Sequence, residues 1–154
     1  MATIIRQAMI DVSPAEAWAA LTDFGGVHRR LAVGFVTDCT LDAPDVRTIS
    51  FSNGAVVKER LVGIDESARR LAYTVIESEL GPSHHNAAAQ IIEDAQAVRF
   101  VWTTDVLPDD LAPTIAGLMD TGIAAIRMTL ERRDVDEARP SPPNARPAPD
   151  RGTR

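Results

Sequence analysis

The chain has 154 residues and a formal net charge of −6 at pH 7, which allows one domain with a substantial core. Clustered Lys and Arg favour binding to nucleic acid or to anionic lipid, whereas this chain is acidic overall. We therefore expect neither a nucleic-acid partner nor membrane insertion. Cys39 is the only cysteine, which excludes an intramolecular disulfide and a cysteine metal cluster. Because no apolar run is long enough for a membrane span or a signal peptide, we expect a cytoplasmic protein.

The first elements of the chain are predicted to be a strand and two short helices. Residues 3–12 are β-branched and loosely alternating, which is typical of a strand with one covered face. Ser13-Pro14-Ala15-Glu16 is a capping box with proline at the first helical position. This helix should end near Asp23, before two glycines, and residues 28–31 are expected to form a second helical turn.

After Gly34 the hydrophobic pattern changes to period two, with turn signals at regular intervals, which predicts an antiparallel meander. The expected strands cover residues 35–41, 47–52, 55–64, 70–78, 86–93 and 98–106. Asn53-Gly54 is the strongest turn signal, and it predicts a two-residue hairpin with positive φ at both positions.

Residues 108–133 form the one segment regular enough for a helix of many turns. Its apolar positions follow helical spacing, and Ile115, Leu118, Gly122 and Ile126 are expected to face the sheet. The composition then changes to a Pro- and Arg-rich segment without large apolar residues. We therefore predict a folded domain over residues 1–133 and a disordered tail over residues 134–154.

Three stretches carry a resemblance to a known superfamily. Residues 13–24 read Ser-Pro-Ala-Glu-Ala-Trp-Ala-Ala-Leu-Thr-Asp-Phe, residues 58–61 read Lys-Glu-Arg-Leu before Asp65, and residues 100–102 read Phe-Val-Trp before the long helix. In order and spacing they are similar to the SRPBCC superfamily, which includes START domains, polyketide cyclases and the birch-pollen allergen. The resemblance implies an α+β helix-grip fold: a curved antiparallel sheet of about seven strands wrapped around a long C-terminal helix.

The superfamily also implies a cavity between sheet and helix that holds a hydrophobic or amphipathic small molecule. No cofactor is expected, because the sequence has no P-loop or dinucleotide fingerprint. Alternation on the strand of residues 55–64 puts Glu59 on the face that points inward in hormone-binding relatives. Glu59 is then either an acid in an apolar pocket, and so a candidate acid/base or ligand anchor, or a cross-strand partner of an arginine at the sheet surface.

Three further polar or aromatic residues are candidates. The Tyr73 hydroxyl is expected either to orient a ligand or to satisfy a core hydrogen bond, and Trp102 to pack in the core or stack on a ligand. His84 and His85 are adjacent on a strand and so point to opposite faces, which argues against a shared metal ion, and no metal site is expected. His85 is a candidate acid/base at the cavity mouth because an ordinary histidine titrates near neutral pH.

Small residues on one strand and on the helix mark either room for a ligand or close contact between helix and sheet. The full set of expected ligand-binding residues is Val57, Glu59, Leu61, Tyr73, Val75, His85, Ala87, Ala89, Trp102, Leu118, Gly122 and Ile126.

The sequence leaves three functions open. The first is a carrier or sensor of a hydrophobic or amphipathic small molecule. The second is a polyketide cyclase, aromatase or dehydratase in which Glu59 or His85 moves a proton. The third is a non-catalytic interaction domain, such as a homodimer, whose hollow is filled by side chains.

Overall fold

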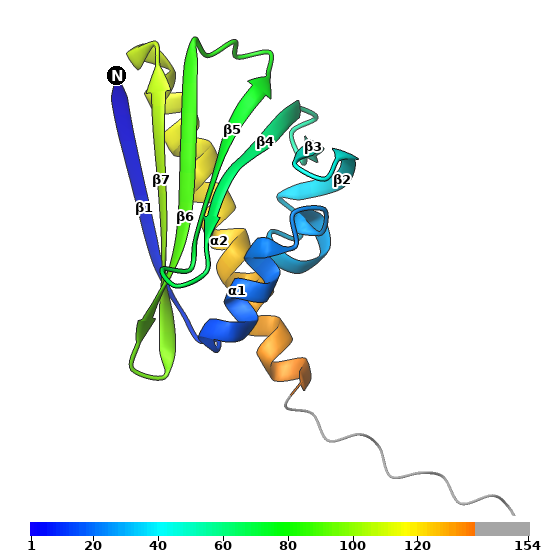
Figure 1. Cartoon of the computed structure of the whole chain (residues 1–154), viewed down its shortest axis with the longest axis vertical. Coiled ribbons are helices and arrows are strands. Elements are labelled where there is room, and N and C mark those ends of the chain that lie inside the picture. Colours follow the sequence, from blue (N-terminus) through cyan, green and yellow to red (C-terminus); the bar gives the residue numbers. More distant parts are fainter. Residues whose placement is uncertain (138–154) are drawn as a thin grey trace, which may run out of the picture.

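Seven antiparallel β-strands curve around one long helix in the computed structural model, which describes residues 1–137 (Figure 1). The strands are β1 (Ala2–Ile10), β2 (Val36–Ala43), β3 (Val46–Phe51), β4 (Val56–Asp65), β5 (Arg70–Glu77), β6 (His84–Asp94) and β7 (Ala97–Leu107). Their order in the sheet is β1-β7-β6-β5-β4-β3-β2. The predicted helix-grip class and the predicted meander are confirmed, and each strand lies within two residues of its expected bounds.

The first helix begins where the local sequence signal places it. Helix α1 (Pro14–Thr22) is capped by Ser13, whose hydroxyl accepts a hydrogen bond from the Glu16 N–H at 3.2 Å. A π-helical turn, η1 (Val27–Leu31), follows it, and a short 3₁₀ turn, η2 (Asp109–Leu111), precedes helix α2 (Ala112–Glu137).

The C-terminal helix differs from its prediction at both ends. Residues 109–111 form the 3₁₀ turn η2 instead of the first turn of α2, which starts at Ala112. Helix α2 then continues to Glu137, so the expected boundary at Arg133 falls inside it. The rest of the predicted tail, residues 138–154, lies outside the described residues.

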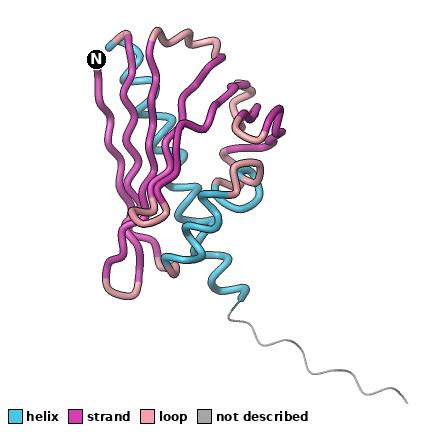
Figure 2. Tube along the Cα trace, in the orientation of Figure 1, coloured by secondary structure: helices cyan, strands magenta, loops and turns pink. Residues whose placement is uncertain are grey.

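The sheet bends because two of its strands contain irregularities. Strand β2 shifts register between Val36 and Asp38 and again near Ala43, and β4 shifts between Lys58 and Glu59 and near Gly63. Such bulges increase the local twist and bend a strand. In Figures 1 and 2, β4, β3 and β2 accordingly turn away from the plane of β1, β7 and β6, so that the sheet faces α2 with its concave side.

The hairpin between β3 and β4 has a longer loop than predicted. Gly54 donates its N–H to the Phe51 carbonyl at 2.9 Å and has a φ of +87°, whereas Asn53 does not have a positive φ. This is the pattern of a turn followed by one left-handed residue, which makes a three-residue hairpin loop. The prediction of a two-residue loop is therefore wrong, and the correction changes which residues of β3 and β4 face each other.

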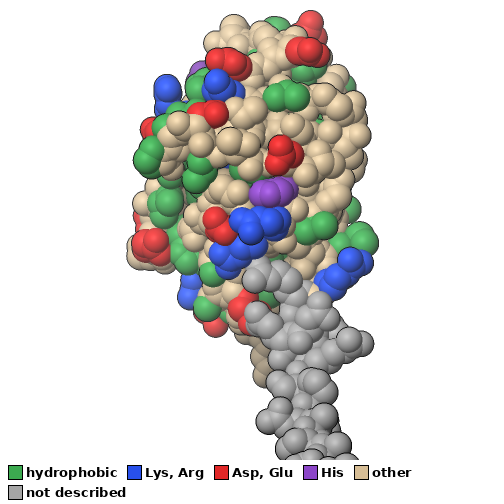
Figure 3. Space-filling view, turned by 90° about the vertical axis from the view of Figure 1, so that its right-hand side faces the viewer, with side chains coloured by type: hydrophobic (Ala, Val, Ile, Leu, Met, Phe, Trp, Pro, Cys, Tyr) green, Lys and Arg blue, Asp and Glu red, His purple; other side chains and the backbone are tan. Residues whose placement is uncertain are grey.

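Apolar side chains from the sheet, α1, η1 and α2 form the core. A large cluster includes Ile10, Leu71, Phe100 and Leu130, and a smaller one joins Ile4, Val106 and Met119 near the start of α2. Outside this core, the face seen in Figure 3 carries acidic and basic side chains in small groups with apolar ones between them, so it presents no extended basic surface.

The two glycines of α2 have different surroundings. A Cβ atom on Gly122 would lie 2.9 Å from ring atoms of both Phe35 and Trp102, whereas one on Gly117 would meet no atom within 4 Å. Of the two interpretations of the small helix residues, close contact with the sheet side therefore applies at Gly122. Gly122 lets two aromatic rings rest against the backbone of α2, and it does not face open space.

These surroundings predict opposite effects for the same substitution. Gly122→Ala should destabilise the protein by about 1–3 kcal/mol, because either Phe35 or Trp102 must move away from the new methyl group. Gly117→Ala is the matched control and should stabilise it by about 0.5–1 kcal/mol through helix propensity. Urea unfolding of both variants measures the difference, and equal effects would contradict the close packing at Gly122.

Candidate functional site

The concave face of the sheet and helix α2 leave two adjoining cavities between them. The inner cavity has a volume of about 70 Å³, and its walls include Leu31, Ile49 and Ile126. The outer cavity has a volume of about 100 Å³, and its walls include residues of the loop between β5 and β6, such as Leu80 and Pro82. Both cavities share one wall, which consists of Phe35, Phe51, Glu59, Tyr73 and Trp102.

Most residues expected at the ligand site lie on these walls. The residues that line one or both cavities are Val57, Glu59, Tyr73, Val75, His85, Ala89, Trp102, Leu118 and Ile126. Leu61, Ala87 and Gly122 do not line them. Leu61 packs against the core next to the irregularity in β4, Ala87 is fully packed, and the rings of Phe35 and Trp102 cover Gly122.

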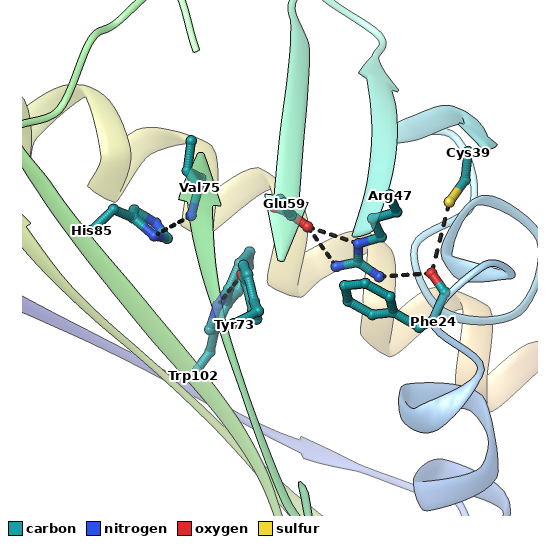
Figure 4. A network of polar contacts seen from close by, with 8 residues as sticks. All are labelled: Phe24, Cys39, Arg47, Glu59, Tyr73, Val75, His85 and Trp102. Atoms are coloured by element: carbon teal, nitrogen blue, oxygen red, sulfur yellow. Dashed lines mark hydrogen bonds and ion pairs between the residues drawn. The ribbon is translucent and has the colours of Figure 1, made fainter. Parts of the chain in front are cut away.

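A buried ion pair connects Glu59 of the shared wall with Arg47, which lines the inner cavity only (Figure 4). Arg47 of β3 faces Glu59 of β4 in the sheet register, and its Nε and Nη2 atoms each lie 2.7 Å from Glu59 Oε2. The two side chains are only 9% and 7% exposed. Glu59 is thus a cross-strand partner of an arginine, as one interpretation held, but the pair faces the cavities and not the outer surface of the sheet.

Arg47 also contacts Phe24, the second residue after the end of α1. Its Nη1 donates to the Phe24 carbonyl at 3.1 Å, and its guanidinium carbon lies 4.0 Å from the centre of the Phe24 ring. Stacking of a guanidinium on an aromatic ring is attractive, more so away from water. All three guanidinium nitrogens of Arg47 therefore have acceptors within the chain.

Sequence analysis missed Arg47 because the residue opposite Arg47 on β4 depends on the length of the loop between β3 and β4. A two-residue loop at Asn53-Gly54 would place Arg47 opposite Arg60, whereas the three-residue loop places it opposite Glu59. The charges were the signal that could have found the pair. A two-residue loop places two arginines opposite each other, which is unfavourable, whereas a three-residue loop pairs Arg47 with Glu59. Phe35 and Phe51 were also missed, because nothing in an alternating apolar pattern separates a cavity wall from a filled core.

Two polar atoms of the shared wall keep hydrogen-bonding capacity. Both contacts of Arg47 go to Glu59 Oε2, so neither of them engages Glu59 Oε1. The Tyr73 hydroxyl accepts a hydrogen bond from Trp102 Nε1 at 3.1 Å and still has its own proton to donate. Burial raises the pKa of Tyr73, and the charge of Glu59 adds to this, so the hydroxyl remains a neutral donor.

His85 lines the outer cavity in a fixed and neutral form. Its Nδ1 accepts the Val75 N–H at 3.1 Å, which leaves the proton on Nε2. Burial lowers the pKa of His85 to about 4, and the neighbouring His84 shifts it in the same direction. At pH 7 the ring therefore offers a single N–H donor, and the acid/base role of His85 stays a prediction.

Among residues 1–137, no group of three or more His, Cys, Asp or Glu side chains could hold a metal ion. Cys39 is half-buried with its Sγ 3.7 Å from the Phe24 carbonyl, and burial raises the pKa of its thiol. Within the same range, no helix is both long and apolar enough to cross a bilayer.

Residues 1–133 match the model of the family described as "Polyketide cyclase / dehydrase and lipid transport". The chain belongs to this family. Membership in the polyketide cyclase/dehydrase family, together with the sheet wrapped around α2, places it in the SRPBCC superfamily. No curated protein matches the sequence.

Solved structures of this fold resemble the chain over almost its whole length. A protein from Thermobifida fusca is 28% identical, with 86% of this chain and 95% of that one covered and a TM-score of 0.70. XoxI from Bacillus cereus is 18% identical over 87% and 99%, with a TM-score of 0.75. A START superfamily protein from Mycobacterium smegmatis is 12% identical over 88% and 99%, with a TM-score of 0.68.

The buried pair predicts a large stability loss when one partner is removed. Arg47→Met should cost about 3–5 kcal/mol, because it leaves the Glu59 carboxylate buried without its cation. The double variant Arg47→Met/Glu59→Met should recover most of this loss. Arg30→Met is the matched control: its ion pair with Asp23 is half-exposed, so the loss should stay within about 1 kcal/mol. Urea midpoints measure all three, and a double variant as unstable as the single one would contradict the argument.

The low pKa of His85 predicts a loss of stability in mild acid. The folded value of about 4 lies below the ordinary value of 6.5, so protonation favours the unfolded chain. The contribution of His85 to stability is complete above about pH 6.5 and is lost as the pH falls to about 4, by about 2–3 kcal/mol. Comparing urea unfolding of the wild type with His85→Gln across this range isolates the effect. A difference that does not change with pH would refute it.

Proposed function

We propose that this polyketide cyclase/dehydrase family protein binds a small hydrophobic or amphipathic molecule in the inner and outer cavities. The observation that carries the proposal is the composition of the walls: apolar side chains surround a few polar atoms, among them Glu59 Oε1, which takes part in neither contact with Arg47. Ligand sites in proteins typically combine an apolar lining with a few placed polar groups. Family membership supports the same function.

The size of the cavities limits the ligand. An engineered apolar cavity of about 150 Å³ takes up benzene. The inner and outer cavities, of about 70 and 100 Å³, together reach this range. Neither cavity reaches it alone, so we expect a single-ring molecule to bind when side chains of the shared wall move aside, without rearrangement of α2 or the sheet. The existence of the two cavities argues against the alternative of a hollow filled entirely by side chains.

The catalytic alternative has weaker support. His85 is neutral at pH 7 and its Nδ1 is already occupied, so a proton-transfer role for it would lack an available basic nitrogen. Glu59 keeps one oxygen toward the cavities, but Arg47 holds the other. A cyclase or dehydratase activity, a homodimer and a cytoplasmic location all stay predictions.

Filling the outer cavity should abolish binding. Val75 lines it, whereas the next residue of β5, Ile76, lies on the other face of the sheet and is 38% exposed. Val75→Phe should therefore weaken binding of toluene, a single-ring apolar probe, by at least about tenfold, because the new ring occupies its space. Ile76→Phe, the matched control, should bind toluene like the wild type.

Titration calorimetry or ligand-detected NMR on the full chain measures these affinities, and circular dichroism confirms that both variants fold. If Val75→Phe folds and binds toluene as well as Ile76→Phe does, the cavities are not the binding site. Native mass spectrometry of the purified protein would in addition reveal a molecule that co-purifies with it.

A further inference from the structure

We propose that the ligand is an uncharged molecule with a hydroxyl group, which donates a hydrogen bond to Glu59 Oε1 and accepts one from the Tyr73 hydroxyl. This inference rests on the proposed function and specifies the chemistry of its ligand. The hydroxyl group would lie at the wall shared by the inner and outer cavities, because Glu59 and Tyr73 line both of them.

The charge balance of the wall favours an uncharged ligand. Glu59 and Arg47 already neutralise each other, at 2.7 Å and almost out of contact with solvent. An ammonium or carboxylate brought into this wall would be a buried ion without its own counter-ion, which is costly. A carboxylate would also meet the free oxygen of Glu59, while the three nitrogens of Arg47 are each engaged by Glu59 or Phe24.

The geometry of the wall favours a hydroxyl group in particular. In the register of β4 and β5, Glu59 faces Val75 and Tyr73 faces Leu61, so Glu59 and Tyr73 are diagonal neighbours on adjacent strands. Such diagonal positions are within reach of long side chains. One offers an acceptor oxygen and the other an O–H donor, and a hydroxyl group is the simplest group that both donates and accepts at a single atom.

Four single-ring probes separate the contributions of shape, hydroxyl and charge. They are phenol, toluene, benzoate and benzylamine, titrated into the full chain at pH 7 by calorimetry or ligand-detected NMR. Phenol should bind at least about tenfold more tightly than toluene, because its hydroxyl gains a hydrogen bond to a charged acceptor. Benzoate and benzylamine should bind more weakly than toluene, because each brings an unpaired charge into the wall.

Two variants test whether Glu59 and Tyr73 cause the preference for phenol over toluene. Tyr73→Phe keeps the ring and removes the donor, so the preference for phenol over toluene, measured on the same variant, should shrink. Arg47→Met/Glu59→Met removes the acceptor without leaving a lone buried charge, and the preference for phenol should disappear. Circular dichroism and urea unfolding show whether each variant is folded. The two variants change different strands, so if one of them misfolds, the other still tests the inference.

The outcomes distinguish this inference from the proposed function. If toluene binds and Val75→Phe removes its binding, but phenol binds no more tightly or benzoate binds best, the hydroxyl inference fails while the cavity remains the site. The inference also fails if phenol is preferred equally by the wild type and the folded variants. If none of the four probes binds, the proposed function fails, and the inference fails with it.

Discussion

The buried Arg47–Glu59 pair ties the β3–β4 hairpin to the end of α1. It links β3 to β4, and through the Phe24 carbonyl it links both strands to the end of α1 (Figure 4). Taking two charges out of water costs free energy, and the loss is offset only when the geometry satisfies their hydrogen bonds. The three nitrogen contacts and the Phe24 ring supply that geometry for Arg47. The hairpin register, the position of Phe24 and the polarity of the cavity wall are therefore coupled.

Helix α2 sets how much space remains between itself and the sheet. One helix cannot cover the concave face of seven strands, so aromatic side chains must bridge the gap. Phe35 and Trp102 do so where Gly122 removes a side chain from the helix, and they reach its backbone there. The contact divides the space instead of filling it, because both rings belong to the wall between the two cavities. Gly122 was one of the residues expected to leave room for a ligand. It instead lets Phe35 and Trp102 contact the helix and separate the two cavities.

The fold could be predicted from the sequence because it depends on local patterns. Alternation, the Ser13 cap and the helical spacing of α2 each report on neighbouring residues. They predicted every strand to within two residues and the start of α1, whereas α2 is displaced by four residues at each end. The site depends on register and burial, which are not local. One extra residue in the Asn53-Gly54 loop exchanges Arg60 for Glu59 opposite Arg47. The pKa of His85 depends on how deeply β6 is covered, which its sequence neighbours do not show.

The polar atoms left over by the fold decide how the site can discriminate between ligands. The apolar walls should bind any apolar molecule of the right size about equally well, so they provide affinity with little selectivity. Glu59 Oε1 and the Tyr73 proton are different, since water in the cavity could satisfy both, and a ligand that displaces water without replacing these hydrogen bonds loses affinity. Because Arg47 occupies only one oxygen of Glu59, the interaction that holds the hairpin together also leaves the group that can select the ligand.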